Sequence, residues 1–188
     1  MISYLQKIDS FTENLNQQTA DALLNISKAA FYKKGDFLLK EGDTCKRSFF
    51  IVKGIARKFY LNDGKEITTE LLFEDDLAIS FHSYLLQKPG REYIQAVSDL
   101  EVTTTDYIEF QNLKKQYTEL VELDLMLTEF YALWIEERLF QFRTLSATER
   151  YLSLLSEQTH LIKYIPLTYI ASYLGINPET LSRIRAKI

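Results

Sequence analysis

The residues best suited to specific chemistry lie near the C-terminus, where polar side chains recur on one side of a short predicted helix. Arg183 can form paired hydrogen bonds with guanine, and Glu179 can accept one from cytosine. The hydroxyl and cationic groups around them suit backbone phosphates. Leu181, Ile184 and Ile188 recur at steps of three and four residues on the opposite, apolar face. The predicted DNA-contacting residues are Thr168, Asn177, Glu179, Thr180, Ser182, Arg183, Arg185 and Lys187.

The signals around this helix predict a helix-turn-helix. Ser146 and Glu149 have the spacing of a capping box, which begins a helix. Pro166 suits the first position of the next helix, and Gly175 can take the left-handed conformation that ends it. Asn177 is then expected to cap the third helix. A helical hairpin with a merely solvated polar face would have similar spacing, but the glycine turn and the basic bias favour DNA binding.

The distribution of charge supports a nucleic-acid partner for this end of the chain. The net charge is −4, but residues 138–188 hold 7 Lys and Arg against 3 Asp and Glu. Residues 1–137 hold 15 against 23. A basic segment attached to an acidic body is typical of a nucleic-acid-binding part joined to a part that binds something else.

The segment from Phe31 to about Asp106 is expected to form short strands between turn signals. Its aromatic and β-branched runs alternate with glycine turns, of which Asp63-Gly64 is the sharpest hairpin signal. These strands predict a β-sandwich or β-roll, preceded by about 30 helical residues, and the whole chain is of the α+β class. The expected strands are Phe37–Leu39, Phe49–Val52, Ala56–Leu61, Ile67–Phe73, Tyr93–Ser98 and Glu101–Thr105.

After Tyr107, nearly 40 residues without Gly or Pro predict one long helix. A seven-residue register gives it an apolar seam, while further apolar residues lie off that seam. We therefore expect one face to pack on the β-domain and the seam to meet a second copy, although burial inside a monomer would also explain the pattern. The predicted dimer residues are Leu120, Leu123, Leu127, Phe130 and Trp134.

Several function classes are disfavoured by what the sequence contains. Two distant histidines and the single Cys45 cannot make a metal centre, and no nucleophile, phosphate-cradling or dinucleotide motif is present. Adjacent acids such as Asp75 and Asp76 diverge rather than converge. We predict a protein that is not an enzyme and has no metal or cofactor. No signal peptide or membrane-spanning run is found, which favours the cytoplasm.

Taken in order, these motifs resemble those of the Crp/Fnr family of transcription regulators over nearly the whole chain. Lys34–Asp43 resembles the family's first strand pair, Phe49–Tyr60 the strand-glycine-strand that follows, and Ile170–Arg185 its helix-turn-helix. Glu179 and Arg183 match the positions of its base-reading residues. The resemblance implies a β-roll effector domain in residues 1–110, a dimerisation helix in 111–144 and a winged-helix DNA-binding domain in 145–188.

Two departures from the family change what the resemblance implies. Members that bind cyclic AMP carry a Gly-Glu pair and an Arg-Ser pair, but here those regions read Leu77–His82 and Gly90–Tyr93. With Glu92 adding a like charge, a cyclic phosphate would be poorly neutralised, so we expect no tight binding of cyclic AMP. The residues after the third helix also leave no room for a wing. The residues that could line a pocket for another, unknown effector are His82, Tyr84, Arg91 and Tyr93.

The expected function is therefore sequence-specific binding of a palindromic promoter site by a homodimer, with RNA polymerase as a further partner. The alternative left open is a dimeric small-molecule sensor whose helical tail contacts protein instead of DNA. Salt dependence separates the two, because phosphate-driven binding weakens steeply as salt is added.

Overall fold

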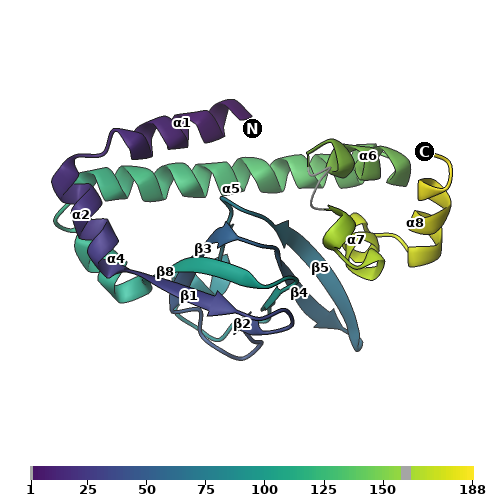
Figure 1. Ribbon diagram of the computed structural model, residues 1–188, viewed down its shortest axis with the longest axis horizontal. Helices are drawn as coiled ribbons and strands as arrows, with labels where there is room; N and C mark the ends of the chain where they lie inside the picture. Colours follow the sequence, from purple (N-terminus) through teal and green to yellow (C-terminus); the bar gives the residue numbers. More distant parts are fainter. Residues whose placement is uncertain (1, 158–161) are drawn as a thin grey trace. The chain divides into compact units, whose positions relative to one another are not determined.

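The computed structural model describes residues 2–157 and 162–188, and its contacts divide the chain into two compact units (Figure 1). One unit contains Met1–Lys28 and Thr105–Leu145, and the other contains Ala29–Thr104 and Ser146–Ile188. The unit with most of the strands thus also includes the C-terminal helices. The predicted domains are three consecutive segments with boundaries near residues 110 and 144. Each of the two units, in contrast, is made of two segments that are far apart in the sequence.

Within these described ranges, eight strands form two four-stranded sheets with the orders β1-β8-β3-β6 and β2-β7-β4-β5. Alternate residues face the interior, where Ile51, Ile94 and Val102 are fully buried. The predicted strands are confirmed, while the strands β1 and β6 and the short helix α3 (Phe81–Leu86) are additions. The strands are β1 (Ser27–Tyr32), β2 (Phe37–Leu39), β3 (Arg47–Lys53), β4 (Ala56–Asn62), β5 (Lys65–Leu72), β6 (Leu77–Ala78), β7 (Tyr93–Ala96) and β8 (Leu100–Asp106).

The predicted hairpin turn joins β4 and β5. Asn62 pairs with Lys65, so only Asp63 and Gly64 connect the strands. Both turn residues have positive φ, 50° and 75°. This is the combination that a two-residue turn requires to match the twist of the strands, and it explains the Asp-Gly sequence. The hairpin leaves β5 at the edge of its sheet.

The helical unit consists of α1 (Ile2–Glu13), α2 (Gln17–Ile26), α4 (Tyr107–Lys114) and α5 (Thr118–Thr144). Its core is formed by Ile8, Leu120, Leu123 and Met126. The prediction of one helix from Tyr107 is wrong in this respect: the chain breaks before α5, although it contains no Gly or Pro there. Among the helices of the described ranges, none combines the length and apolarity needed to cross a lipid bilayer.

The C-terminal helices α6 (Ala147–Glu157), α7 (Leu167–Leu174) and α8 (Pro178–Arg185) pack against one end of the β-roll. The capping box is confirmed, since the Ser146 amide donates to Glu149 Oε2 at 2.7 Å and the Glu149 amide to Ser146 Oγ at 3.3 Å. Hydrogen bonds from the hydroxyl and amide of Ser146 lower the pKa of Glu149. Pro166 precedes α7 as its N-cap, one residue earlier than predicted.

Candidate nucleic-acid interface

The turn between α7 and α8 is a Schellman motif built on Gly175. Its φ and ψ of 67° and 36° are left-handed, as predicted. The Gly175 amide donates to the Ser172 carbonyl at 3.0 Å, and the Ile176 amide donates to the Ala171 carbonyl at 3.0 Å. These bonds satisfy carbonyls in the last turn of α7 and turn the chain sharply, so that α8 begins at Pro178, three residues after Gly175.

Helix α8 begins where it was predicted, but the expected capping hydrogen bond of Asn177 is not formed. Asn177 is the N-cap in an extended conformation, and Pro178 occupies the first turn. The Asn177 side chain, however, makes no capping hydrogen bond to the helix. It is exposed, as is Thr168 in the first turn of α7. Both side chains are therefore accessible to a ligand outside the protein.

Helix α8 presents opposite faces to the protein and to solvent. Leu181 is fully buried and Ile184 is 8% exposed, and both belong to the core formed with Ile170, Ala171 and Leu174. Ile188 does not continue this face, because it lies beyond the helix and is 63% exposed. The exposed polar residues of the helix are Glu179, Ser182, Arg183 and Arg185, Thr180 is half-buried, and Lys187 is exposed beyond the end of the helix.

The side chain of Arg183 is aligned along this outer face. Its Nη2 donates to Thr180 Oγ1 at 3.2 Å, one helical turn earlier. The guanidinium remains exposed and has donors available for a base edge or a phosphate. Of the predicted DNA-contacting residues, Glu179, Thr180 and Arg183 thus lie along one side of α8, Ser182 and Arg185 are exposed elsewhere on the same helix, and Thr168, Asn177 and Lys187 lie outside it.

The four residues predicted for an effector pocket are not gathered at one point. His82 and Arg91 are exposed, whereas Tyr84 is buried on the same short helix as His82. Tyr93 stacks on Phe59 with ring centroids 4.9 Å apart. Partial burial and a hydrogen bond to Glu41 raise the pKa of Tyr93. The different exposures of His82 and Tyr84 could not be predicted, because the helix that carries both, α3, was not expected from the sequence.

The interior of the roll contains ionisable groups that the sequence did not single out. Lys58 Nζ is paired with Glu70 and also donates to the Ile79 carbonyl at 3.2 Å, and both charged side chains are buried. Ser80 Oγ donates to Glu92. The buried cation is thus already neutralised, and a second carboxylate lies near the start of α3. Lys58 therefore has its positive charge compensated within the roll.

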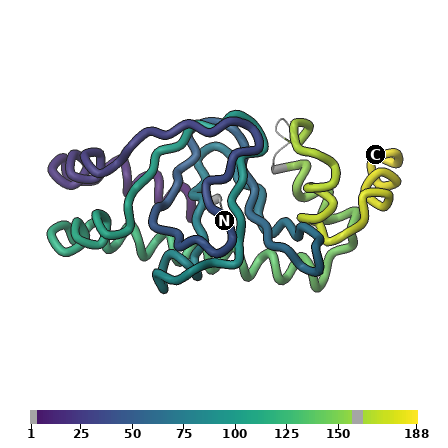
Figure 2. The backbone as a smooth tube through the Cα atoms, turned by 90° about the horizontal axis from the view of Figure 1, so that it is seen from below, coloured from purple at the N-terminus to yellow at the C-terminus, as the bar shows by residue number. Residues whose placement is uncertain are grey.

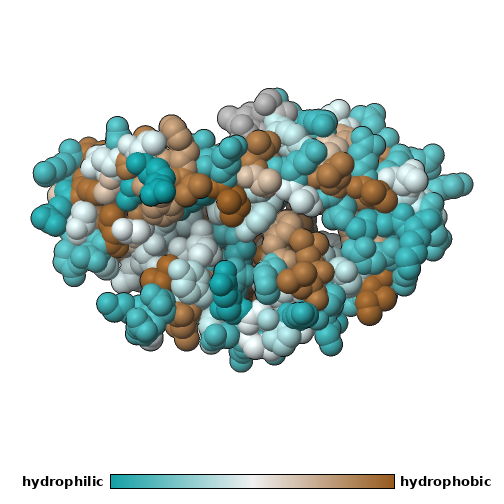
Figure 3. Space-filling view, turned by 180° about the vertical axis from the view of Figure 1, so that it is seen from behind, coloured by the Kyte–Doolittle hydropathy of each residue, from teal (hydrophilic) through white to brown (hydrophobic). Residues whose placement is uncertain are grey.

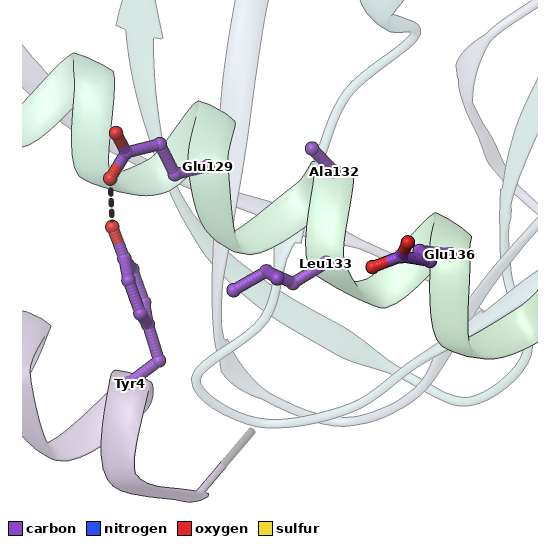
Figure 4. A pocket seen from close by; sticks show the side chains of 5 residues that line it. All are labelled: Tyr4, Glu129, Ala132, Leu133 and Glu136. Atoms are coloured by element: carbon purple, nitrogen blue, oxygen red, sulfur yellow. Dashed lines mark hydrogen bonds between the residues drawn. The ribbon is translucent and has the colours of Figure 1, made fainter.

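The helical unit places the predicted dimer seam against its own N-terminal helix. Leu120 and Leu123 are buried there, and Leu127 and Phe130 pack on the same cluster. Figure 4 shows the neighbouring pocket, where Tyr4 of α1 donates a hydrogen bond to Glu129 of α5. The remaining lining residues of this pocket are Ala132, Leu133 and Glu136. Trp134, the last predicted seam residue, is half-buried and stacks on Tyr131.

A different stripe of α5 is exposed, with residues separated alternately by four and three positions, the spacing of a coiled-coil seam. The exposed fractions of its large apolar side chains range from 44% to 60%. Hydrophobic side chains also reach the surface in patches in the view of Figure 3. We call these residues the outer stripe: Val121, Leu125, Thr128, Ala132, Ile135, Leu139 and Phe142.

Comparisons with known proteins agree with this fold. Residues 29–117 match the family model described as cyclic nucleotide-binding domain. Among curated proteins no match was found. FixK2 from Bradyrhizobium japonicum is 16% identical with a TM-score of 0.74, covering 86% of this chain and 84% of its own.

Two further solved structures are similar over most of their length. A protein described as a transcriptional regulator of the Crp/Fnr family from Eubacterium rectale is 20% identical, with a TM-score of 0.73 over 93% of this chain and 84% of its own. The c-di-GMP responsive global regulator CLP from Xanthomonas campestris is 12% identical, with a TM-score of 0.70 over 92% and 91%. At these identities the likeness concerns the fold. The chain therefore contains a match to a cyclic nucleotide-binding domain within a fold similar to that of Crp/Fnr-type regulators.

Proposed function

We propose that this protein is a transcription regulator of the Crp/Fnr type that binds a palindromic DNA site as a homodimer. The observation that carries the proposal is the two-faced helix α8, with Leu181 and Ile184 in the core and Arg183 outward beside other polar groups. A helix held in this way after a tight turn can enter the major groove. Such a regulator would act in the bacterial cytoplasm and contact RNA polymerase at promoters.

The outer stripe of α5 supports the homodimer. Its apolar residues continue over the length of the helix, from Val121 to Phe142, and they are exposed. Pairing with the same stripe of a second copy would bury them in a coiled-coil seam and place two DNA-binding units in one particle. This stripe replaces the seam predicted from the sequence.

The interior of the roll supports an effector other than cyclic AMP. The ammonium group of Lys58 is compensated by Glu70, and Glu92 adds negative charge beside Ser80. A ligand with a single compact anionic group would have to displace one of these carboxylates from its partner.

The proposal is tested by sequencing the genomic fragments that the purified protein retains. Fragments that share a palindrome are expected. In titrations with such a fragment, Arg183→Ala should weaken binding by about 1–3 kcal/mol, and affinity should fall steeply with salt. Lys53→Ala is the matched control, because it removes one exposed positive charge from strand β3 and should leave the affinity nearly unchanged. Equal affinities for the wild type and Arg183→Ala would contradict base reading by α8.

A further inference from the structure

The edge of strand β5 is closed by a side chain of the DNA-binding helices. The Thr68 amide donates to Ser172 Oγ of α7 at 2.8 Å, and the same hydroxyl donates to the Glu66 carbonyl at 3.0 Å. One hydroxyl thus occupies the position where a neighbouring strand would supply a donor and an acceptor. In Figures 1 and 2, β5 and α7 lie side by side.

A buried arginine forms the second part of this contact. The Arg57 side chain lies between two rings, 4.0 Å from the centroid of Phe59 in the roll and 3.5 Å from that of Tyr169 in α7. It is only 1% exposed. Its Nη2 lies 2.6 Å from a Glu66 carboxylate oxygen, and Nε and Nη2 donate to Gln95 Oε1 at 3.1 and 2.7 Å. Tyr169 therefore covers a desolvated cation that belongs to the roll.

The apolar core continues through the same contact. Leu71 and Phe73 of the roll belong to one buried cluster with Ile170, Ala171 and Leu174 of α7. A hydroxyl clasp, an arginine between rings and a shared core all join the β4–β5 hairpin to one helix. We call this set of contacts the hairpin clasp.

We propose that the hairpin clasp couples the roll directly to the DNA-binding helices and holds them in the orientation that binds DNA. The residues of the hairpin clasp contact α7 and leave the polar face of α8 exposed. The clasp can therefore orient α8 without covering the residues proposed to contact DNA. This inference rests on the proposed function. The clasp would be a second connection between the roll and the DNA-binding helices, besides the one that α5 would provide.

Strand β4 carries the connection from the interior of the roll to α7. Adjacent residues of a strand point to opposite faces, so Lys58 is directed toward Glu70 and Ile79 while Arg57 is directed toward Tyr169. A ligand that separated Lys58 from Glu70 would act on the two strands of the hairpin. Any resulting shift of the strand would move Arg57 against its ring partner.

Hydrogen exchange of the full chain tests the clasp without DNA. Ser172→Ala should speed exchange of the Thr68 amide about tenfold or more, because its hydrogen-bond acceptor is lost. Arg57→Met should speed exchange in α7 and α8. Arg47→Met, which removes an exposed arginine from β3, is the matched control and should leave both helices unchanged. If α7 and α8 exchange equally in Arg57→Met and the wild type, the coupling proposal is overturned.

DNA binding by clasp variants tests the orienting role. Tyr169→Leu combined with Ser172→Ala should weaken binding to a selected genomic fragment about tenfold, because only a fraction of molecules then has the competent orientation. The slope of affinity against salt should not change, since no phosphate contact is removed. Tyr169→Phe keeps the ring and should bind like the wild type. Unchanged or tighter binding by the double variant would overturn the proposal.

The two proposals fail in different ways. If the wild type retains no DNA, the proposed function fails, whereas the exchange experiment still decides whether the clasp joins the roll to α7 and α8. If the wild type binds DNA and Arg183→Ala weakens it while the double clasp variant does not, base reading by α8 stands and coupling through the hairpin is overturned.

Discussion

The guanidinium of Arg150 in α6 donates from Nε and Nη2 to the backbone carbonyl of Leu174, at 3.2 and 3.0 Å. Leu174 is the last residue of α7, so its carbonyl has no acceptor role left inside the helix. The positive charge also lies at the negative end of the helix dipole. Arg150 thus ties α6 to the beginning of the turn that directs α8.

Replacing Arg150 should lower stability in a graded order. Arg150→Met removes both hydrogen bonds and is expected to cost about 1–3 kcal/mol in the free energy of unfolding, because hydrogen bonds to charged groups are strong. Arg150→Lys keeps the charge but not the paired geometry and should cost less. Urea denaturation measures both, and equal stability of the Met and wild-type proteins would contradict this role.

Charges placed on the outer stripe should produce monomers. Leu125→Glu with Leu139→Glu would bury carboxylates in the proposed seam, at a cost of several kcal/mol, so we expect dimerisation to weaken by about 100-fold or more. Sedimentation velocity measures the mass over a range of concentrations. Leu24→Glu makes the same change at an exposed position of α2 and should leave the dimer intact. A dimer that survives the double change would exclude this stripe as the interface.

The turn between β3 and β4 requires glycine for two reasons. Gly54 has a φ of +105°, and a Cβ there would lie 2.4 Å from the Asp99 carbonyl oxygen. Gly54→Ala is therefore expected to destabilise the protein by about 3 kcal/mol or more. Gly64 has a φ of +75° with no atom within 4 Å of its Cβ position, so Gly64→Ala should cost only about 1 kcal/mol. Thermal or urea unfolding of the two variants would show whether the steric contact matters.

The contribution of Asp76 to the free energy of unfolding should increase as the pH falls from about 7 toward 4. Burial raises its pKa from 3.8 to about 6, assisted by the nearby Glu70 and Asp75, while a hydrogen bond from the Phe73 amide acts in the opposite direction. Because the folded pKa exceeds the unfolded one, the folded state binds more protons between these values and loses stability as pH rises through them.

The substitution Asp76→Asn removes this titration and keeps an acceptor for the Phe73 amide, which lies 2.7 Å from Asp76 Oδ2. The variant should be more stable than the wild type at pH 7, by on the order of 1–3 kcal/mol, and the difference should shrink toward pH 4. Denaturant titrations at several pH values provide the measurement. A difference independent of pH would show that Asp76 does not titrate in this range.

Local signals allowed much of the fold to be predicted. Asp63-Gly64, the Ser146 and Glu149 pair and Gly175 each impose a backbone conformation within a few residues, and each is found where expected. The buried and exposed faces of α8 could be predicted for the same reason, since they follow from helical spacing. Its contacts with DNA stay a prediction.

Features that depend on distant partners could not be predicted in this way. Helix α5 has two apolar stripes. The packing of α1, α2 and α4 buries Leu120 and Leu123 inside the chain, while Leu125 and Leu139 are exposed. A charged residue such as Arg57 is normally expected on the solvent-facing side of a strand. Here it is buried because Tyr169, which is far away in the sequence, stacks on it.

The hydroxyl of Ser172 also has a consequence for solubility. An unpaired strand edge invites intermolecular strand addition and aggregation. In the intact chain the Thr68 amide and the Glu66 carbonyl are both occupied by α7. A fragment ending after β8 would release them and uncover the apolar residues beneath. It should therefore self-associate into β-rich aggregates, which the intact chain should not form.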